Sequence, residues 1–338
     1  MTGHSPRPAA LRWGILATGG IAAAFAADLR TAGLDLVAVG SRSQDSADAF
    51  AARYGIARAH GSYAALVADP DVDIIYVATP HPMHHADARL ALEHGKHVLV
   101  EKAFTLNRAE AQDLADLGRE KGLLVMEAMW TRYLPHMARL REIIAAGTLG
   151  EIRTVSADHT QTLPTDPAHR LNALELGGGA LLDLAIYPIS FVVGVLGVPT
   201  EVKAVARLLE TGADAEVATV MTHDGGAIST TFSSSRTAGP NTAVVLGTKA
   251  RVEIERWWWS PSVLRVIDPE GVVLEEFSAR PAEGEGRGMQ YEAIAAERYV
   301  ADGSLDSDLL PVAESVAIMG LLDEIRAQIG VRYPNEIA

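Results

Sequence analysis

From Leu11 to about Val125, short apolar runs alternate with segments whose apolar residues recur at helical spacing. Strands that alternate with helices in this way form a parallel sheet covered by helices on both faces. The expected strands are residues 11–16, 35–40, 73–78, 97–100 and 123–126. We therefore predict that residues 1–125 form an α/β domain with a doubly wound parallel sheet.

The pattern changes after residue 126. One more helix is expected at residues 136–147, and stretches that alternate apolar and polar residues then follow, separated by turn sequences. Helices are expected near residues 289–302 and 311–329. We predict that residues 126–338 form a second, α+β domain with an open and largely antiparallel sheet.

Composition excludes several classes of protein. A net charge of −14 argues against a nucleic-acid partner, because phosphate backbones repel it. The chain contains no cysteine, which excludes disulfides and a cysteine nucleophile and fits a cytoplasmic protein. Pro188 and Gly194 interrupt the most apolar stretch, residues 184–199, so we expect no membrane-spanning segment.

A glycine-containing turn lies between the first expected strand and the following helix. In a dinucleotide-binding Rossmann fold this turn is tight, and its backbone amides meet the cofactor pyrophosphate at the helix N-terminus. Ala17 stands where glycine is usual; alanine fits there with a negative φ and is strained with a positive one. The residues predicted to line the pyrophosphate are Ala17, Thr18, Gly19, Gly20 and Ile21.

The second expected strand ends at Gly40 and is followed by Ser41-Arg42-Ser43. A site that prefers NAD places a carboxylate here to bind the ribose 2′-hydroxyl. A guanidinium and hydroxyl groups suit a 2′-phosphate instead, because arginine binds phosphate through paired hydrogen bonds. We therefore predict NADP rather than NAD, with Ser41 and Arg42 as ligands. The alternative is a solvated arginine ahead of a helix capped by Ser43 or Asp45.

Glu101 and Lys102 follow directly on the apolar run 97–100. Ligands of open parallel sheets bind outside the carboxyl ends of the strands. A lysine in this place is ordinary surface when it stands alone. With the predicted cofactor turn at the same edge of the sheet, Lys102 becomes a candidate for chemistry.

Three glycines lead into the segment "ALLDLAIYPISF", where Asp183 and Tyr187 are four residues apart. This spacing places both side chains on one face of the expected helix, and Pro188 is expected to kink or loosen that helix. Structural roles stay open for both: Asp183 as a carboxylate that complements the helix dipole, and Tyr187 as a core tyrosine.

Five segments occur in an order that resembles the glucose-fructose oxidoreductase, inositol dehydrogenase and MocA (Gfo/Idh/MocA) family. They are "ILATGGIA", "ATPHPMHH", "HVLVEKA", "MEAMWTRYLP" and "GGGALLDLAIYP". The resemblance spans nearly the whole chain. Within the family, "EAMWTRYLP" and a tyrosine at position 187 are most similar to the branch of NADP-dependent D-xylose 1-dehydrogenase and dimeric dihydrodiol dehydrogenase.

This resemblance implies that Lys102, in the motif Glu101-Lys102-Ala103, is the catalytic lysine. It also implies a second motif, Asp183–Tyr187. Ala103 stands where the family has a proline and Ala185 where it has a glycine. Because that proline shapes the turn that aims the lysine, the effect of these replacements stays open.

Oxidation of an alcohol or hemiacetal needs a base for the hydroxyl proton and a hydride acceptor nearby. The resemblance suggests Tyr187 as the base. The reference pKa of a tyrosine, about 10, is high for this task, and the Lys102 ammonium would lower it. Asp183 is expected to accept a substrate hydroxyl or to orient the pair. Further residues expected at the cofactor are Glu101, Thr79, Pro80, His84, Trp130 and Arg132.

His81, His84 and His85 raise the question of a metal site. No carboxylate cluster accompanies them in the sequence, and the family works without metal, so we expect none. These histidines are expected to cap the following helix and to contact the cofactor.

Three consecutive tryptophans follow Arg256. On a strand, Trp257 and Trp259 would share one face. A contact with substrate or a second subunit and packing beneath the terminal helices are equally open.

The sequence thus predicts an NADP-dependent dehydrogenase for a sugar or polyol. Two alternatives stay open: a reductase of keto-sugars or related carbonyls, and an NADP-binding regulator without catalysis. Retention of Lys102 and Tyr187 argues against the regulator, which needs neither. The resemblance implies a homodimer or homotetramer formed through the C-terminal sheet, in a domain that also binds substrate.

Overall fold

The apolar runs of the N-terminal part form a six-stranded parallel sheet in the computed structural model, which describes residues 11–282 and 286–334. The described chain divides into two units. Unit 1 holds residues 11–105, 110–130 and 286–315; unit 2 holds residues 106–109, 131–282 and 316–334.

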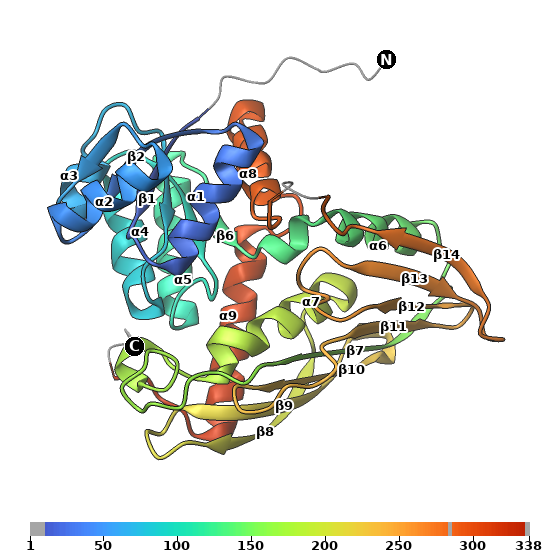
Figure 1. The fold of residues 1–338 in the computed structure, drawn as a ribbon. Coiled ribbons are helices and arrows are strands. Elements are labelled where there is room, and N and C mark those ends of the chain that lie inside the picture. Colours follow the sequence, from blue (N-terminus) through green and yellow to red (C-terminus); the bar gives the residue numbers. More distant parts are fainter. Residues whose placement is uncertain (1–10, 283–285, 335–338) are drawn as a thin grey trace, which may run out of the picture. The chain divides into compact units, whose positions relative to one another are not determined.

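The unit 1 sheet has the strand order expected of a doubly wound fold, with the first and fourth strands side by side. Figure 1 labels β1, β2 and β6 of this sheet. In that order the strands are β3 (Arg58–His60), β2 (Asp35–Gly40), β1 (Arg12–Leu16), β4 (Ile74–Val77), β5 (His97–Glu101) and β6 (Val125–Ala128). Its helices are α1 (Gly20–Ala32), α2 (Gln44–Tyr54), α3 (Tyr63–Val67), α4 (His84–Glu93), α5 (Arg108–Lys121) and α8 (Gln290–Asp302). The predicted α/β class and parallel sheet are confirmed.

Aromatic side chains join β1, α1 and β4 in the core of unit 1. The Phe25 ring stacks on Tyr76 with 3.8 Å between ring centroids, and the edge of Trp13 meets Phe25 at 5.5 Å. Trp13 also donates from its indole nitrogen to Glu297 of α8, at 3.1 Å. Asp28 of α1 accepts three backbone N–H bonds from residues 287–289, at 2.8–2.9 Å. A helix from near the end of the chain therefore completes this unit.

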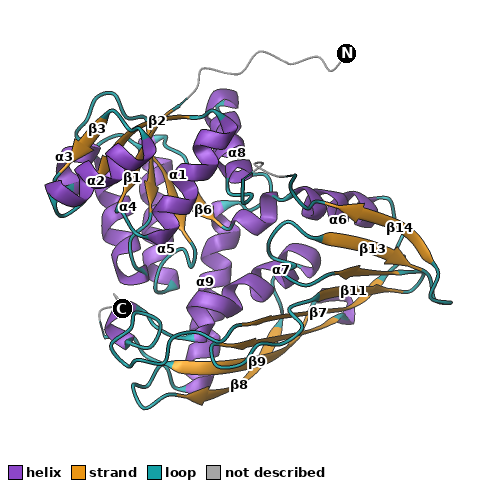
Figure 2. Cartoon of the chain, viewed as in Figure 1, coloured by secondary structure: helices purple, strands orange, loops and turns teal. Residues whose placement is uncertain are grey.

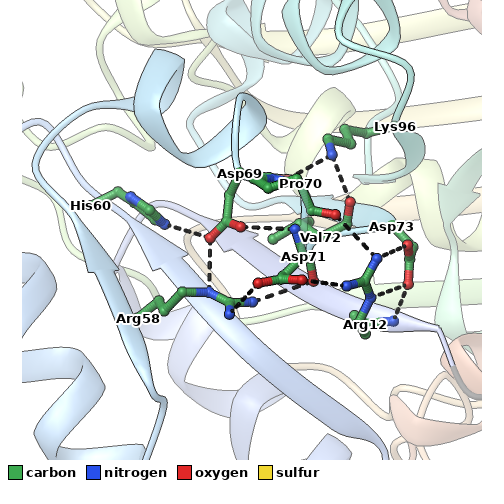
Figure 3. A network of polar contacts seen from close by, with 9 residues as sticks. All are labelled: Arg12, Arg58, His60, Asp69, Pro70, Asp71, Val72, Asp73 and Lys96. Carbon is green, nitrogen blue, oxygen red and sulfur yellow. Dashed lines mark hydrogen bonds and ion pairs between the residues drawn. The ribbon is translucent and has the colours of Figure 1, made fainter.

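A polar network ties together the amino ends of β1, β4 and β5 (Figure 3). Arg12 makes two parallel hydrogen bonds to the Asp73 carboxylate, at 2.8 and 2.9 Å. Lys96 donates to the carbonyl oxygens of Asp69 and Val72, each at 2.7 Å. The network lies at the amino ends of these strands, so it stabilises the sheet at the edge opposite the predicted cofactor site.

Unit 2 is built on an eight-stranded sheet (Figure 2). All neighbouring strands are antiparallel except β7 and β10, so the predicted open, largely antiparallel sheet is confirmed. In spatial order the strands are β14 (Val273–Ser278), β13 (Val263–Ile267), β12 (Arg251–Ile254), β11 (Ala243–Gly247), β7 (Ile152–Thr160), β10 (Ile228–Ser234), β9 (Asp214–Thr222) and β8 (Glu201–Leu208).

Helices pack on one face of this sheet. Helix α6 (Pro135–Ala145) packs on β13 and β14, and α7 (Ile186–Leu196) packs on β7 and β10. Helix α9 (Val312–Ile329) is the last helix of the described chain. Within the described residues, only Leu174–Leu196 is long and apolar enough to cross a membrane, and 78% of its most apolar window is buried. We therefore assign it to the core.

The tryptophan run lies in a turn rather than on a strand. Strand β12 ends at Ile254, and Trp257 adopts a positive φ of 65°. Its backbone N–H donates to Asn241, and its carbonyl accepts from Ser260. Because the chain turns here, strand alternation does not apply: Trp258 and Trp259 are both buried, and Trp257 is 43% exposed.

Candidate functional site

The turn between β1 and α1 is open to a phosphate ligand. Helix α1 begins at Gly20, after an extended Gly19, so the amides of its first turn have no partners within the helix. An added Cβ at Gly19 or Gly20 would meet no described atom within 4 Å. The predicted ligands Thr18 and Ile21 flank these glycines in the sequence. Exposed amides at a helix N-terminus fit a pyrophosphate.

Ala17 has a φ of +93°, in the region that favours glycine. Its N–H donates to the carbonyl oxygen of Gly40 at 2.9 Å, which joins the ends of β1 and β2. The tight turn is therefore formed with an alanine at its first position. The side chain is strained there, because a Cβ disfavours a positive φ.

Ser41, Arg42 and Ser43 lie at the carboxyl end of β2. Ser43 is the N-cap of α2 and accepts from the backbone N–H of Ser46, so of the two caps considered, Ser43 and Asp45, Ser43 caps the helix. Ser41 is buried and Arg42 is exposed. Burial raises the pKa of Asp87, and the charge of Arg42 opposes that rise. The exposed Arg42 guanidinium thus lies close enough to the half-buried Asp87 carboxyl for their charges to interact.

Glu101 is a buried support for the backbone at Lys102. Its carboxylate accepts a hydrogen bond from the Tyr76 hydroxyl and another from the Lys102 backbone N–H, the latter at 3.2 Å. Burial raises the pKa of Glu101, and the nearby charge of Lys102 opposes this effect. The Lys102–Ala103 peptide bond is cis. Lys102 therefore follows a strand end that is fixed by side chains beneath it.

His84 joins this strand end to the loop after β4. Its ring nitrogens lie 2.9 Å from the Ala103 carbonyl oxygen and 2.8 Å from the Thr79 carbonyl oxygen. Burial lowers the pKa of His84 to about 4, and its hydrogen bonds to the two carbonyl oxygens oppose that shift. Thr79 is buried and Pro80 is exposed.

The histidines of this loop do not cap α4. Its N-cap residue is Met83, whose thioether makes no capping bond, and the ring of His84 contacts two carbonyl oxygens instead. His85 contacts Asp113 at 2.7 Å. Among the described residues, no three His, Asp or Glu side chains are arranged to hold a metal ion. The expectation of a metal-free site stays a prediction.

Trp130 and Arg132 follow β6 and fall in different units. In unit 1, the Arg287 guanidinium lies over the Trp130 ring at 5.4 Å. In unit 2, Arg132 is buried and donates to the Ser190 hydroxyl at 3.0 Å and the Ser190 carbonyl at 2.7 Å. Arg132 therefore anchors α7, and its contact with a cofactor stays a prediction.

Asp183 and Tyr187 belong to unit 2, at the start of α7. Asp183 lies in a π-helical turn, Leu181–Ala185, which widens the backbone just before Tyr187, as expected next to Pro188. The Asp183 carboxylate is paired with Arg170 at 3.4 Å. Since Lys102 belongs to unit 1, the predicted meeting of the amine and the phenol stays a prediction.

Sequence reasoning missed the groups that support the predicted residues. Tyr76 holds Glu101, Arg170 pairs with Asp183, and His159 contacts Tyr187. Each pair is separated by more than ten residues, so no local motif links its members.

Comparison with known families decides the relationship. Residues 11–129 match the oxidoreductase family with an NAD-binding Rossmann fold, and residues 137–253 match the GFO/IDH/MocA C-terminal domain. The chain belongs to the GFO/IDH/MocA family. The resemblance predicted from the motifs is therefore confirmed, and the chain is a member of an oxidoreductase family.

Individual relatives match along almost their whole length. Trans-1,2-dihydrobenzene-1,2-diol dehydrogenase from Bos taurus is 37% identical, over 97% of this chain and 99% of its own. D-xylose 1-dehydrogenase (NADP(+)) from Hypocrea jecorina is also 37% identical, over 98% and 95%. The crystal structure of KijD10, a 3-ketoreductase from Actinomadura kijaniata in complex with NADP and TDP-benzene, has a TM-score of 0.82 at 27% identity, over 95% of this chain and 98% of that chain.

The strain at Ala17 gives a prediction about stability. Ala17→Gly should raise the free energy of unfolding by about 0.5–1 kcal/mol, because relief of the positive φ outweighs the added entropy of the unfolded chain. Calorimetric unfolding measures the change. Ala23→Gly, within α1, is the matched control and should lower stability by about 1 kcal/mol. Equal destabilisation by both changes would contradict the strain at position 17.

Proposed function

We propose that this chain is an NADP-dependent oxidoreductase that transfers a hydride between nicotinamide and a hydroxyl-bearing carbon of a sugar, polyol or related cyclic diol. One observation carries the proposal. Relatives 37% identical over nearly the whole chain are named as dehydrogenases of D-xylose, with NADP(+), and of a dihydrobenzenediol. The groups needed for this chemistry, Lys102 and Tyr187, are present here.

The residues predicted at the cofactor fit it. The open amides of the turn at residues 17–21 would hold the pyrophosphate, and Ser41 and Arg42 the 2′-phosphate. Thr79, Pro80, His84, Glu101, Trp130 and Arg132 are proposed as further neighbours. When bound, the nicotinamide supplies the hydride acceptor or donor.

Lys102 and Tyr187 are proposed as the acid–base pair. In oxidation, Tyr187 accepts the hydroxyl proton as the C–H hydride departs, and the Lys102 ammonium stabilises both the phenolate and the developing charge on the substrate oxygen. In reduction, the same pair returns the proton. Asp183, held by Arg170, accepts a hydrogen bond from a second substrate hydroxyl. KijD10 has been crystallised with a lysine replaced by alanine or glutamate and with a tyrosine replaced by phenylalanine.

The second candidate is reduction of a keto-sugar. The similarity to the 3-ketoreductase KijD10 favours it. Both directions use the same residues, so NADPH absorbance with a panel of aldoses, inositols and keto-sugars separates them. A regulator without catalysis would change NADPH with none of these compounds.

A second copy of the chain is proposed to cover the outer face of the unit 2 sheet. Strand register places Val205, Ala218 and Phe232 side by side across β8, β9 and β10, and Val205 is 71% exposed. Other exposed apolar residues on this face are Val220, Ile228 and Leu246. An exposed apolar patch of this kind marks an interaction surface. When the same patch on two copies packs together about a two-fold axis, the result is a dimer.

The edge of this sheet is unsuited to pairing at β8. Gln328 of α9 accepts from the backbone N–H of Ala204 and donates to the carbonyl of Val202, each at 2.9 Å. A side chain thus occupies edge groups that another strand would need. This favours association through the outer face of the sheet.

The lack of cysteine fits a cytoplasmic location, which stays a prediction.

The acid–base pair is tested by Lys102→Met and Tyr187→Phe. Each should lower kcat by roughly 10²–10⁴-fold, because proton transfer and charge stabilisation are lost, while NADP still binds. Steady-state kinetics and NADP titration measure the two effects. Lys121→Met and Tyr291→Phe, at exposed positions, are the matched controls. Turnover like the wild type in Lys102→Met and Tyr187→Phe would show that other residues do the chemistry.

Cofactor preference is tested by Arg42→Ala. The Kd for NADP should rise roughly 10–100-fold, the range expected when a charge-assisted hydrogen bond worth about 1.5–3 kcal/mol is removed, and the Kd for NAD should change little. Arg53→Ala, on the last turn of α2, is the control. An unchanged ratio of the two constants would refute phosphate binding by Arg42.

The dimer is tested by Phe232→Glu. A charge on the outer face should dissociate the assembly to the monomer mass of 35.9 kDa, measured by light scattering after size exclusion. Val272→Glu, 57% exposed in the turn between β13 and β14, should leave the mass unchanged. A wild-type protein that is already monomeric at micromolar concentration contradicts the proposal.

A further inference from the structure

Pro188 leaves a gap in the hydrogen bonding of the helix that carries Tyr187. In an α-helix each N–H donates to the carbonyl four residues earlier. Proline has no N–H, so residue 188 cannot donate to the carbonyl oxygen of Leu184. The backbone there has already widened into the π-helical turn Leu181–Ala185. The N–H of Ile186 reaches the carbonyl oxygens of Leu181 and Leu184, so a donor from outside the helix gives the Leu184 oxygen a second hydrogen bond in place of the one that Pro188 cannot make.

His159 of β7 supplies that donor. Its Nδ1 lies 3.2 Å from the Leu184 carbonyl oxygen. Its Nε2 lies 2.8 Å from the amide nitrogen of Gln161, which follows directly after the end of β7 at Thr160. Because an amide nitrogen donates, Nε2 accepts, and the ring carries its proton on Nδ1. The tautomer set by Gln161 is therefore the one that fills the gap left by Pro188.

The same imidazole packs against the phenol ring. Its edge contact with Tyr187 has 5.0 Å between ring centroids and an interplanar angle of 72°, an attractive arrangement for aromatic rings. A face of the imidazole stacks on Trp259 at 3.6 Å and 26°. His159 and Trp259 are 2% and 6% exposed. The imidazole is thus held by Trp259 and bounds one side of Tyr187.

We propose that His159 is a positioning residue for Tyr187. It acts through two restraints: its hydrogen bond fixes the turn from which Tyr187 projects, and its ring limits the rotation of the phenol. The proposal rests on the role of Tyr187 as the base. Precise placement matters because a displacement of about 1 Å in a reacting group costs roughly 100-fold in rate.

The two restraints are removed one at a time. His159→Phe keeps a ring and removes the N–H; His159→Asn keeps an N–H near the Nδ1 position and removes the ring. Each should lower kcat by roughly 10–100-fold and shift the pH profile of kcat/KM, because the base is misplaced. The Kd for NADP should stay at the wild-type value, since the proposed phosphate ligands belong to unit 1.

A rescue separates the hydrogen bond from the ring contact. Pro188→Ala restores an N–H that can donate to Leu184. Combined with His159→Phe it should recover most of the lost kcat, and combined with His159→Asn it should not. An unrescued His159→Phe/Pro188→Ala variant overturns the backbone restraint.

His223→Phe is the matched control. His223 is also buried in unit 2, and its Nδ1 contacts the carbonyl of Gly197, at the other end of α7, at 3.0 Å. Its replacement should lower the unfolding temperature without moving the pH profile. Wild-type kcat and pH profile in both His159 variants, with Tyr187→Phe inactive, overturn the positioning role and leave the proposed function standing. Wild-type kcat in Tyr187→Phe overturns the proposed function and this inference with it.

Discussion

Parallel hydrogen bonding of β1 with both β2 and β4 brings the carboxyl ends of these strands to one edge of the sheet. The glycine turn, Arg42 and the loop at Thr79 follow these strands, and Lys102 follows β5, which pairs in parallel with β4. The polar network of Arg12 and Lys96 lies at the amino ends. One pattern of strand pairing therefore places the proposed cofactor site at one edge of the sheet and the stabilising polar network at the other.

The main elements of the fold could be predicted because each carries its own local pattern. Buried parallel strands are apolar throughout, so the runs that became β1, β2, β4, β5 and β6 stood out. Strand β3 was missed because it has three half-buried residues, Arg58–His60. The tryptophan turn was misjudged because its bulky residues are typical of strands, whereas a positive φ at Trp257 turns the chain. That the helix at residues 290–302 belongs to unit 1 depends on contacts with Trp13 and Asp28, which no local pattern reveals.

In the candidate site, too, some residues could be predicted from a local sequence pattern and others depend on contacts between distant segments. Lys102 and Tyr187 could be proposed from the sequence because Lys102 follows a buried strand and because both lie in motifs that resemble those of the family. The groups that hold them, Tyr76 for the strand end at Glu101 and His159 for the tyrosine, lie at least 25 residues away in the sequence. Such partners depend on register between strands and helices. The candidate residues were therefore visible in the sequence, and the side chains that support them were not.

This chain has alanine at three motif positions where the family has glycine or proline, which raises the question of whether it is still an enzyme. Ala17 forms the tight turn with a positive φ, Ala103 presents its carbonyl to His84, and Ala185 lies in the π-helical turn before Tyr187. A regulator that only binds NADP has no need to hold the backbone of Lys102 on a buried carboxylate or to brace Tyr187 with a histidine of fixed tautomer. Because both supports are present, the three alanines are better explained as changes tolerated by an enzyme than as signs of a lost one.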